Sequence, residues 1–321
     1  MSSFGDPPVL QNAPEPPIQP REGDVFIGPN GLRAGWRISI YIGLVAIFGA
    51  ILRFAAQLVH HLRHPAGEAA ANAALFTPVT AMVSEIILAA VVLGAAGVMS
   101  RIEQRAPGVY GIPIREAFGK KFWQGMLWGL VAVSALVGAV GVAGGYSFGA
   151  LALSPQMIIQ DGILWLIAFF FVGIFEEFTF RGYLQFTLGQ GIGFWPAAVI
   201  LSALFGCVHL GNPGEGWVGA LSVFEIAMFF ALTLRRTGNL WFAIGLHCSF
   251  DWGETFLYSV PNSGNVAEGA LSHAVLHGPK WITGGTIGPE GSLFCFLIVL
   301  LMFFVFHVMY PEKAAIGQAG S

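Results

Sequence analysis

The sequence predicts an all-α protein, built as a polytopic transmembrane bundle of about eight spanning helices. Of its 321 residues, 55% are hydrophobic and only 10% are charged, and the mean hydropathy is +0.70. A soluble globular domain carries about 25% charged residues, so this chain lacks the polar surface that a water-soluble protein needs. The formal net charge of −3 argues against nucleic-acid partners, which bind strongly basic surfaces.

The second observation is a series of long apolar runs. A spanning helix needs roughly 20 mostly apolar residues. The fifth run found here is short and contains Pro196 near its start, so we expect it to be tilted or to cross incompletely. The eight runs are Ile38 to Val59, Leu75 to Met99, Phe122 to Gly145, Ile163 to Leu188, Trp195 to Leu210, Trp217 to Leu234, Leu240 to Tyr258 and Leu293 to Met309.

The third observation is the distribution of Lys and Arg between the runs. The second-to-third connection is rich in both, and the sixth-to-seventh contains Arg235 and Arg236. The third-to-fourth and fifth-to-sixth connections contain neither. Because short cytoplasmic loops are enriched in Lys and Arg, eight spans with both termini in the cytoplasm satisfy this pattern. We therefore expect an integral protein of the plasma (inner) membrane, surrounded by membrane lipids.

The chain divides into three parts. Residues 1–35 contain seven prolines and no apolar run, which is typical of a disordered tail, here expected in the cytoplasm. Residues 36–310 form the helical bundle, with a catalytic core at about 160–258, and residues 311–321 form a short C-terminal tail. The Gly-rich loop at 259–291 is either a lid or a flexible connection, and we favour the connection.

Ionisable residues inside apolar helices indicate a functional site, because each costs several kcal/mol in a membrane core. Three of the predicted helices carry such residues in clusters. The residues are Glu176, Glu177 and Arg181 on the fourth helix, His209 on the fifth, and His247 and Asp251 on the seventh. Isolated carboxylates at Glu85 and Glu225 are weaker candidates, and Glu254 follows Asp251 closely enough to share its polar face.

The two adjacent glutamates are expected to do different work. At about 100° per residue, Glu177 and Arg181 lie four apart on nearly the same helical face. Arg181 can hold the Glu177 carboxylate in a charge-assisted pair, which gives Glu177 a structural role. Glu176 points roughly 100° away, and we expect it to face the bundle interior. His247 and Asp251 are also four apart, so Asp251 can support the imidazole.

Two related chemistries use one free Glu and two His on separate helices. Glu176, His209 and His247 can bind a metal such as zinc, with one position open for water. Alternatively, Glu176 is a general base for a water that His209 holds, while His247 and Asp251 stabilise the oxyanion. Both are hydrolytic reactions without a covalent nucleophile. The cofactor is accordingly Zn²⁺ or none.

Three motifs in the chain resemble those of a known family. EExxxR at Glu176–Arg181, FxxxH at Phe205–His209 and HxxxD at His247–Asp251 are similar, in type and order, to the motifs of the CPBP intramembrane proteases. That family includes the type II CAAX prenyl endopeptidases and related abortive-infection and bacteriocin-immunity proteins. Prenyl proteases usually have Asn at the last motif position, where this chain has Asp251.

The resemblance implies an endopeptidase that acts on a membrane-associated or lipidated peptide or protein. It maps water activation to Glu176, the two histidines to His209 and His247, and the last polar residue to Asp251. Two other functions stay open: a non-catalytic immunity or scaffold protein of the same family, and a proton-coupled transporter, which also uses buried Glu and His.

Overall fold

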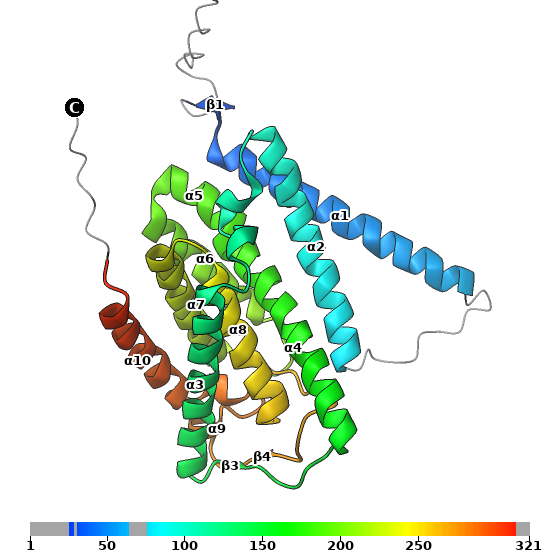
Figure 1. Ribbon diagram of the computed structural model, residues 1–321, viewed down its shortest axis with the longest axis vertical. Helices are drawn as coiled ribbons and strands as arrows, with labels where there is room; N and C mark the ends of the chain where they lie inside the picture. The colour runs from blue at the N-terminus through cyan, green and yellow to red at the C-terminus, as the bar shows by residue number, and fades with distance from the viewer. Residues whose placement is uncertain (1–25, 29–30, 64–75, 313–321) are drawn as a thin grey trace, which may run out of the picture.

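A computed structural model describes residues 26–28, 31–63 and 76–312 of the chain, and within them helices dominate (Figure 1). Two pairs of two-residue strands are the exceptions. β1 (Ile27–Gly28) pairs with β2 (Gly31–Leu32), and β3 (Tyr146–Ser147) pairs with β4 (Val275–Leu276), both antiparallel. The first 25 residues of the predicted proline-rich tail, and residues 313–321, lie outside the described residues.

Each of the eight predicted spans corresponds to a helix, which confirms the all-α membrane bundle. Among the described residues, five helices are long and apolar enough to cross a membrane, counting α4 together with its continuation to Ile192. The other three are shorter, at 16 residues for α6, 12 for α8 and 17 for α10. The eight are α1 (Ala34–Arg63), α2 (Pro78–Ile102), α3 (Lys120–Val142), α4 (Pro155–Glu177), α6 (Phe194–His209), α7 (Trp217–Thr237), α8 (Trp241–Trp252) and α10 (Leu293–Met309). Short segments connect them: η1 (Pro107–Tyr110), η2 (Ile114–Glu116), α9 (Lys280–Thr283) and η5 (Pro289–Gly291).

The fourth predicted span, Ile163 to Leu188, is not one regular helix. α4 ends at Glu177 and continues as a π-helical turn, η3 (Phe178–Leu184), and then as α5 (Gln185–Ile192). Gly182 leaves the helical region at φ −83° and ψ −110°. α8 likewise continues as a π turn, η4 (Gly253–Leu257). π turns inside helices occur frequently at functional sites, and these two directly follow the predicted chemical residues.

Local sequence signals explain where three of the helices begin. Thr77 caps α2 in a capping box, with Pro78 at the first helical position. Ser154 caps α4 and is also followed by a proline, and Ser292 caps α10 through its hydroxyl. These side chains accept hydrogen bonds from N–H groups that have no partner within the helix, which fixes the start of each helix.

Helices α3 and α8 pack closely through small residues. Gly125 and Gly129 on α3 face the backbone of α8, and a Cβ atom added at either glycine would overlap α8 carbonyl oxygens. Gly245 on α8 lies equally close to the backbone of α3. Small residues four apart let membrane helices approach to backbone contact. This contact fixes α8, and with it His247, against the bundle.

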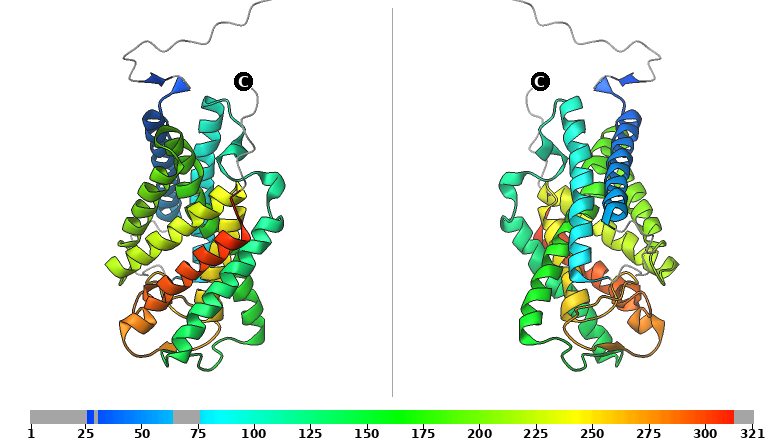
Figure 2. Two further views of the ribbon diagram at one scale, coloured as in Figure 1. Left: turned by 90° about the vertical axis from the view of Figure 1, so that its left-hand side faces the viewer. Right: turned by 90° about the vertical axis from the view of Figure 1, so that its right-hand side faces the viewer.

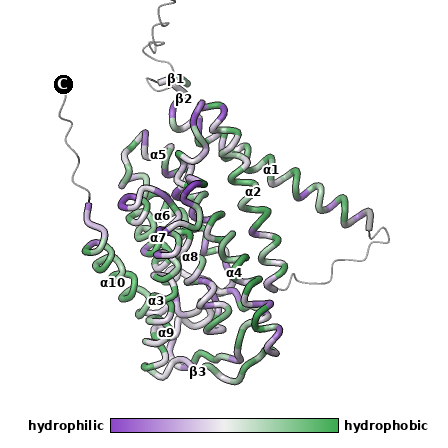
Figure 3. The backbone as a smooth tube through the Cα atoms, in the orientation of Figure 1, coloured by the Kyte–Doolittle hydropathy of each residue, from purple (hydrophilic) through white to green (hydrophobic). Residues whose placement is uncertain are grey.

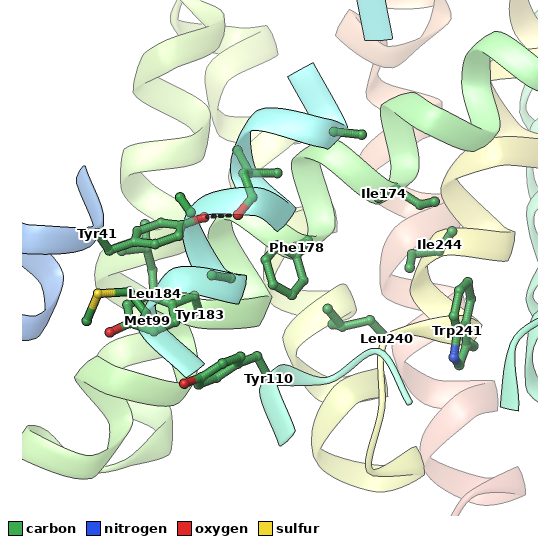
Figure 4. Close-up of a cluster of buried hydrophobic side chains, with 14 of the residues drawn as sticks. Tyr41, Met99, Tyr110, Ile174, Phe178, Tyr183, Leu184, Leu240, Trp241 and Ile244 are labelled. Carbon is green, nitrogen blue, oxygen red and sulfur yellow. Dashed lines mark hydrogen bonds between the residues drawn. The ribbon is translucent and has the colours of Figure 1, made fainter. Parts of the chain in front are cut away.

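A large aromatic and aliphatic cluster joins α1, α2, η3 and α8 next to the ionisable residues (Figure 4). Tyr41 stacks on Tyr183 with ring centroids 4.3 Å apart, and Phe178 and Ile244 are almost completely buried within it. Phe178 directly follows the two glutamates in the chain. Packing of Phe178 therefore holds the end of α4 at a defined position relative to α8.

The outer helices of the bundle are rich in hydrophobic residues, as Figure 3 shows for α2 and α10. Exposed side chains include Phe54 on α1, Leu127 on α3 and Phe304 on α10, each more than 60% exposed. The helices differ strongly in how much of their length is buried within the bundle. In the apolar 18-residue stretch of each helix, 56% of the residues are buried in α7 but only 6% in α1. α7 is therefore a central helix, and α1 lies at the periphery (Figure 2).

The two basic connections lie at the same end of the bundle, at the top of Figure 1. The backbone N–H of Leu240, between α7 and α8, donates to the carbonyl of Gly111, between α2 and α3. The end of α10 reaches the same region, because Arg236 contacts His307 at 3.4 Å. The chain thus brings its Lys- and Arg-rich connections to one face, as the alternation in the sequence predicts.

Candidate active site

The adjacent glutamates at the end of α4 have different environments. Glu177 is completely buried, and its Oε1 accepts a hydrogen bond at 3.3 Å from the Arg181 guanidinium. Arg181 is also buried and lies over the Phe205 ring, 4.4 Å from its centroid. The Glu176 side chain keeps 23% of its surface exposed and lines a cavity between the helices. The structure therefore contains the ion pair and the divergent faces that the helical spacing predicts.

His247 lies at the centre of a group of carboxylates. Its Nδ1 is 2.9 Å from Glu177 Oε1. Its Nε2 is 3.5 Å from Glu176 Oε2 and 3.4 Å from Asp251 Oδ2. The imidazole also stacks on the Phe230 ring, with centroids 5.3 Å apart and planes inclined by 11°. Two helices and an aromatic wall thus fix the orientation of this ring.

The contact between Glu177 and His247 is a feature that sequence reasoning missed. The four-residue spacing predicts that Glu177 pairs with Arg181, but it gives no information about a partner on another helix. A carboxylate that accepts from Nδ1–H fixes the tautomer and leaves Nε2 as the chemically available nitrogen. Glu177 therefore has two roles. It pairs with Arg181, and it positions the His247 ring.

His209 reaches the same cavity from the end of α6. Its Nδ1 is 2.9 Å from the Phe205 carbonyl oxygen, so that nitrogen donates and Nε2 is left to accept or to hold a water. The Phe205 ring packs edge-on against the imidazole, with centroids 4.5 Å apart. Phe205 contacts both His209 and Arg181, which explains physically why a bulky aromatic occupies the first position of the FxxxH motif.

The cavity has a volume of about 210 Å³ and brings together residues that are far apart in the sequence. Glu176, His209, His247 and Asp251 all line it. Glu177 and Arg181 do not, which agrees with a supporting position behind the cavity wall.

Further polar residues line the cavity. Glu85 comes from α2, where its place as a single acid in an apolar helix made it a weaker candidate in the sequence. Four polar lining residues from the long loop and η5 were not predicted: Asn262, Ser263, Asn265 and Glu290. Glu290 Oε2 accepts hydrogen bonds from the backbone N–H and the hydroxyl of Ser263, at 2.7 and 2.9 Å. This loop, for which a flexible connection was favoured, forms one wall of the cavity.

Glu290 lies outside the membrane-spanning helices and is strongly affected by its surroundings. Burial raises its pKa to about 7, and the negative charge of Asp251 adds to this effect. The hydrogen bonds from Ser263 act in the opposite direction, because they stabilise the ionised form. Glu290 therefore changes its charge near neutral pH at the edge of the cavity.

The side chains do not supply the metal site considered above. Within the described ranges, no group of three or more His, Cys, Asp or Glu side chains is arranged to hold a metal ion. His247 Nε2 lies 3.5 Å from Glu176 Oε2 and 3.4 Å from Asp251 Oδ2, but His209 does not complete a ligand group with them. As they lie here, the described side chains do not form the Glu–His–His ligand set.

Comparison with known proteins gives one family. Residues 158–253, from α4 to the first residue of η4, match the model for Type II CAAX prenyl endopeptidase Rce1-like proteins. The segment contains all three motifs, from Glu176 to Asp251. A comparison with curated proteins gives no match. The family match, with its three motifs converging on one cavity, supports membership of the CPBP family of intramembrane proteases.

Proposed function

We propose that this protein is an intramembrane endopeptidase, which hydrolyses a peptide bond of a membrane-associated or lipidated protein with a water activated by Glu176. The family match supports a CAAX-type intramembrane protease at the level of the family. The observation that carries the finer proposal is the convergence of Glu176, His209, His247 and Asp251 on one cavity inside the bundle.

The proposed roles follow from which atoms are free. Glu176 is the member of the glutamate pair with an exposed carboxylate, since Glu177 is fully buried against Arg181. His209 has its Nδ1 occupied by the Phe205 carbonyl, so its Nε2 can accept a hydrogen bond from a water. Glu176 then takes a proton from that water as it attacks the scissile carbonyl, and passes the proton to the leaving amine.

His247 is proposed to stabilise the oxyanion that forms on the scissile carbonyl. Its Nδ1 donates to Glu177, which leaves Nε2 directed toward Glu176 and Asp251 at the cavity. An imidazole that carries both protons can donate from Nε2 to the oxyanion, while Asp251 orients the ring. A fixed donor aimed at developing charge is typically the largest single contribution to acyl-transfer catalysis.

The chain is an integral membrane protein, and we infer that its basic end faces the cytoplasm. The Lys- and Arg-rich connections meet there, the end of α10 contacts one of them through His307, and Arg37 near the start of α1 pairs with Glu103 beside the other. By the positive-inside rule, we propose that both termini lie in the cytoplasm, with the protein in the plasma membrane. In this orientation the wall formed by the loop after η4 lies on the opposite side.

The test of this function is a comparison of membrane proteomes from cells that express the wild type or Glu176→Gln. Glu225→Gln is a matched control, because Glu225 is an acid in an apolar helix that does not line the cavity. The proposal predicts uncleaved membrane proteins that accumulate with Glu176→Gln and not with Glu225→Gln. If both variants give the wild-type proteome, the endopeptidase assignment is wrong.

A further inference from the structure

A second pocket lies at the basic end of the bundle, apart from the cavity that Glu176 lines. Its lining residues come from η1, η3, α5 and the end of α7, and α5 lies at the top of Figure 1. The two spaces share no lining residue. The second has a volume of about 360 Å³. Ligand pockets in proteins typically have about 300–1,000 Å³, so this space is large enough for a small polar group.

The polar side chains that line this pocket are basic or neutral. They include Arg181, Arg235, Gln185 and Gln190, and no Asp or Glu of the described chain is among the lining residues. Arg235 is exposed, and its guanidinium lies 5.4 Å from the centroid of the Phe194 ring. None of the ion pairs between described residues includes Arg235. Its charge is therefore available to an anion that enters the pocket.

Three further arginines lie around the same space. Arg181 closes the pocket on its inner side, with a side chain that is 1% exposed. Arg37 donates from Nη1 to Gln190 Oε1 at 2.6 Å. The guanidinium of Arg105 lies 5.4 Å from the centroid of the Phe186 ring. Because Gln190 and Phe186 both line the pocket, these two arginines lie directly behind its walls.

The acids next to these arginines are too few to neutralise them. Glu177 pairs with Arg181, and Glu103 pairs with both Arg37 and Arg105. Together with Arg235, four arginines face two acids, which leaves an excess of two positive charges in this group. Low-dielectric walls of one sign of charge concentrate ions of the opposite sign, so the pocket favours an anion.

Two of the lining side chains also have polar atoms without a hydrogen-bond partner in the described chain. Arg181 Nη2 has no acceptor. Gln185 is almost completely buried and donates from Nε2 to the Phe194 carbonyl at 2.9 Å, but its Oε1 has no donor. Buried polar groups without partners are costly. A ligand that has both a negative charge and a hydroxyl group suits this wall.

We propose that the pocket binds a phosphate oxyanion, and that the headgroup of an anionic phospholipid supplies it. The phosphate would pair with Arg235 and lie in the field of the arginines behind the wall, with a headgroup hydroxyl near Gln185. The pocket lies at the end of the bundle that we infer to face the cytoplasm, and basic pockets between membrane helices on that side bind phospholipid head groups. This site is separate from the endopeptidase chemistry and does not depend on it.

The experiment measures the Tm of the full-length protein in nanodiscs of three kinds. One contains phosphatidylcholine alone, and one contains phosphatidylcholine with phosphatidylglycerol. The third is phosphatidylcholine with inorganic phosphate in the buffer, compared with chloride at equal ionic strength. Since a ligand that binds only the folded state raises stability, we expect phosphatidylglycerol to raise Tm by several degrees. A rise with inorganic phosphate but not with the lipid would overturn the lipid as the source, and no rise with either would overturn the site.

Three variants locate the effect. Arg235→Gln removes the available charge. Gly189→Leu fills the pocket without a change in charge, because a Cβ there meets only the Phe194 Cα, at 3.8 Å. Arg115→Gln is the matched control, since Arg115 is an exposed arginine of the basic α2–α3 connection that does not line the pocket. The Tm of each variant in phosphatidylcholine alone shows whether it folds, and Arg235→Gln decides the test if Gly189→Leu does not.

The rise in Tm with phosphatidylglycerol should be lost in Arg235→Gln and Gly189→Leu and retained in Arg115→Gln. The dissociation constant of phosphatidylglycerol, measured by native mass spectrometry, should increase about fivefold in Arg235→Gln, because one arginine is lost at the membrane surface. It should stay at the wild-type value in Arg115→Gln. An equal rise in Tm in all four proteins would show that the lipid acts on the whole basic surface, and would overturn the proposed pocket.

Discussion

Replacement of Arg181 by Ala tests the supporting structure behind the site. The guanidinium is 3.3 Å from Glu177 Oε1, and the two side chains are 1% and 0% exposed. Removal of one partner of a buried ion pair leaves an uncompensated charge and costs roughly 3–5 kcal/mol. Glu177 keeps its contact with His247 at 2.9 Å, so we expect about 3 kcal/mol, the lower end of this range.

The assay is thermal unfolding of the purified protein in lipid nanodiscs. A loss of 3 kcal/mol corresponds to a fall in Tm on the order of 6–12 °C. Arg235→Ala is the control, because Arg235 is exposed and its guanidinium lies 5.4 Å from the centroid of the Phe194 ring. Its loss should cost about 1 kcal/mol or less. The double variant Glu177→Gln with Arg181→Met removes both charges and should recover most of the lost stability. Wild-type Tm in Arg181→Ala, or a double variant less stable than the single one, would refute this reasoning.

Three further predictions concern the helix contact, the orientation of His247 and the acid at the loop. Gly129→Ala should lower Tm by several degrees because its Cβ would overlap the α8 backbone, whereas Gly138→Ala should not, because the space there is open. Equal Tm values for the two variants would contradict the close packing of α3 on α8. Glu177→Gln should reduce kcat by about 10²-fold with little change in KM, since it disturbs the ring position of His247 rather than substrate binding; a change in KM alone would contradict this role. The pKa of Glu290 is raised to about 7, which disfavours its ionised form in the folded state. The stability of the wild type should therefore fall relative to Glu290→Gln from about pH 4.5 to 7 and then level off. Parallel curves of Tm against pH for the two proteins would show that the folded-state pKa is not raised.

Much of the fold follows from the sequence because the bilayer imposes a simple rule. A spanning segment must satisfy its backbone hydrogen bonds internally, so a long apolar run implies a helix, and all eight runs correspond to helices. The break after Glu177 did not follow from that rule. A π turn with Gly182 outside the helical region depends on packing around Phe178, which a hydropathy pattern does not record.

The candidate site shows the same division between local and distant information. Spacing along one helix predicts that Glu177 meets Arg181 and that Glu176 turns elsewhere, and both features are present. The contact of Glu177 with His247 joins residues 70 positions apart, and the loop wall at Glu290 lies still farther along the chain. Neither has a periodic signal, because each depends on how α4, α8 and the loop pack in three dimensions.

The central claim, that Glu176 activates water for peptide hydrolysis, is tested most directly by turnover of purified protein in nanodiscs. Wild type, Glu176→Gln and Glu225→Gln are compared on one cleaved membrane peptide, after their Tm values have been matched to show intact folds. The account predicts that Glu176→Gln loses about 10²- to 10⁴-fold in kcat, while Glu225→Gln retains the wild-type rate. A folded Glu176→Gln protein that cleaves at the wild-type rate would contradict it.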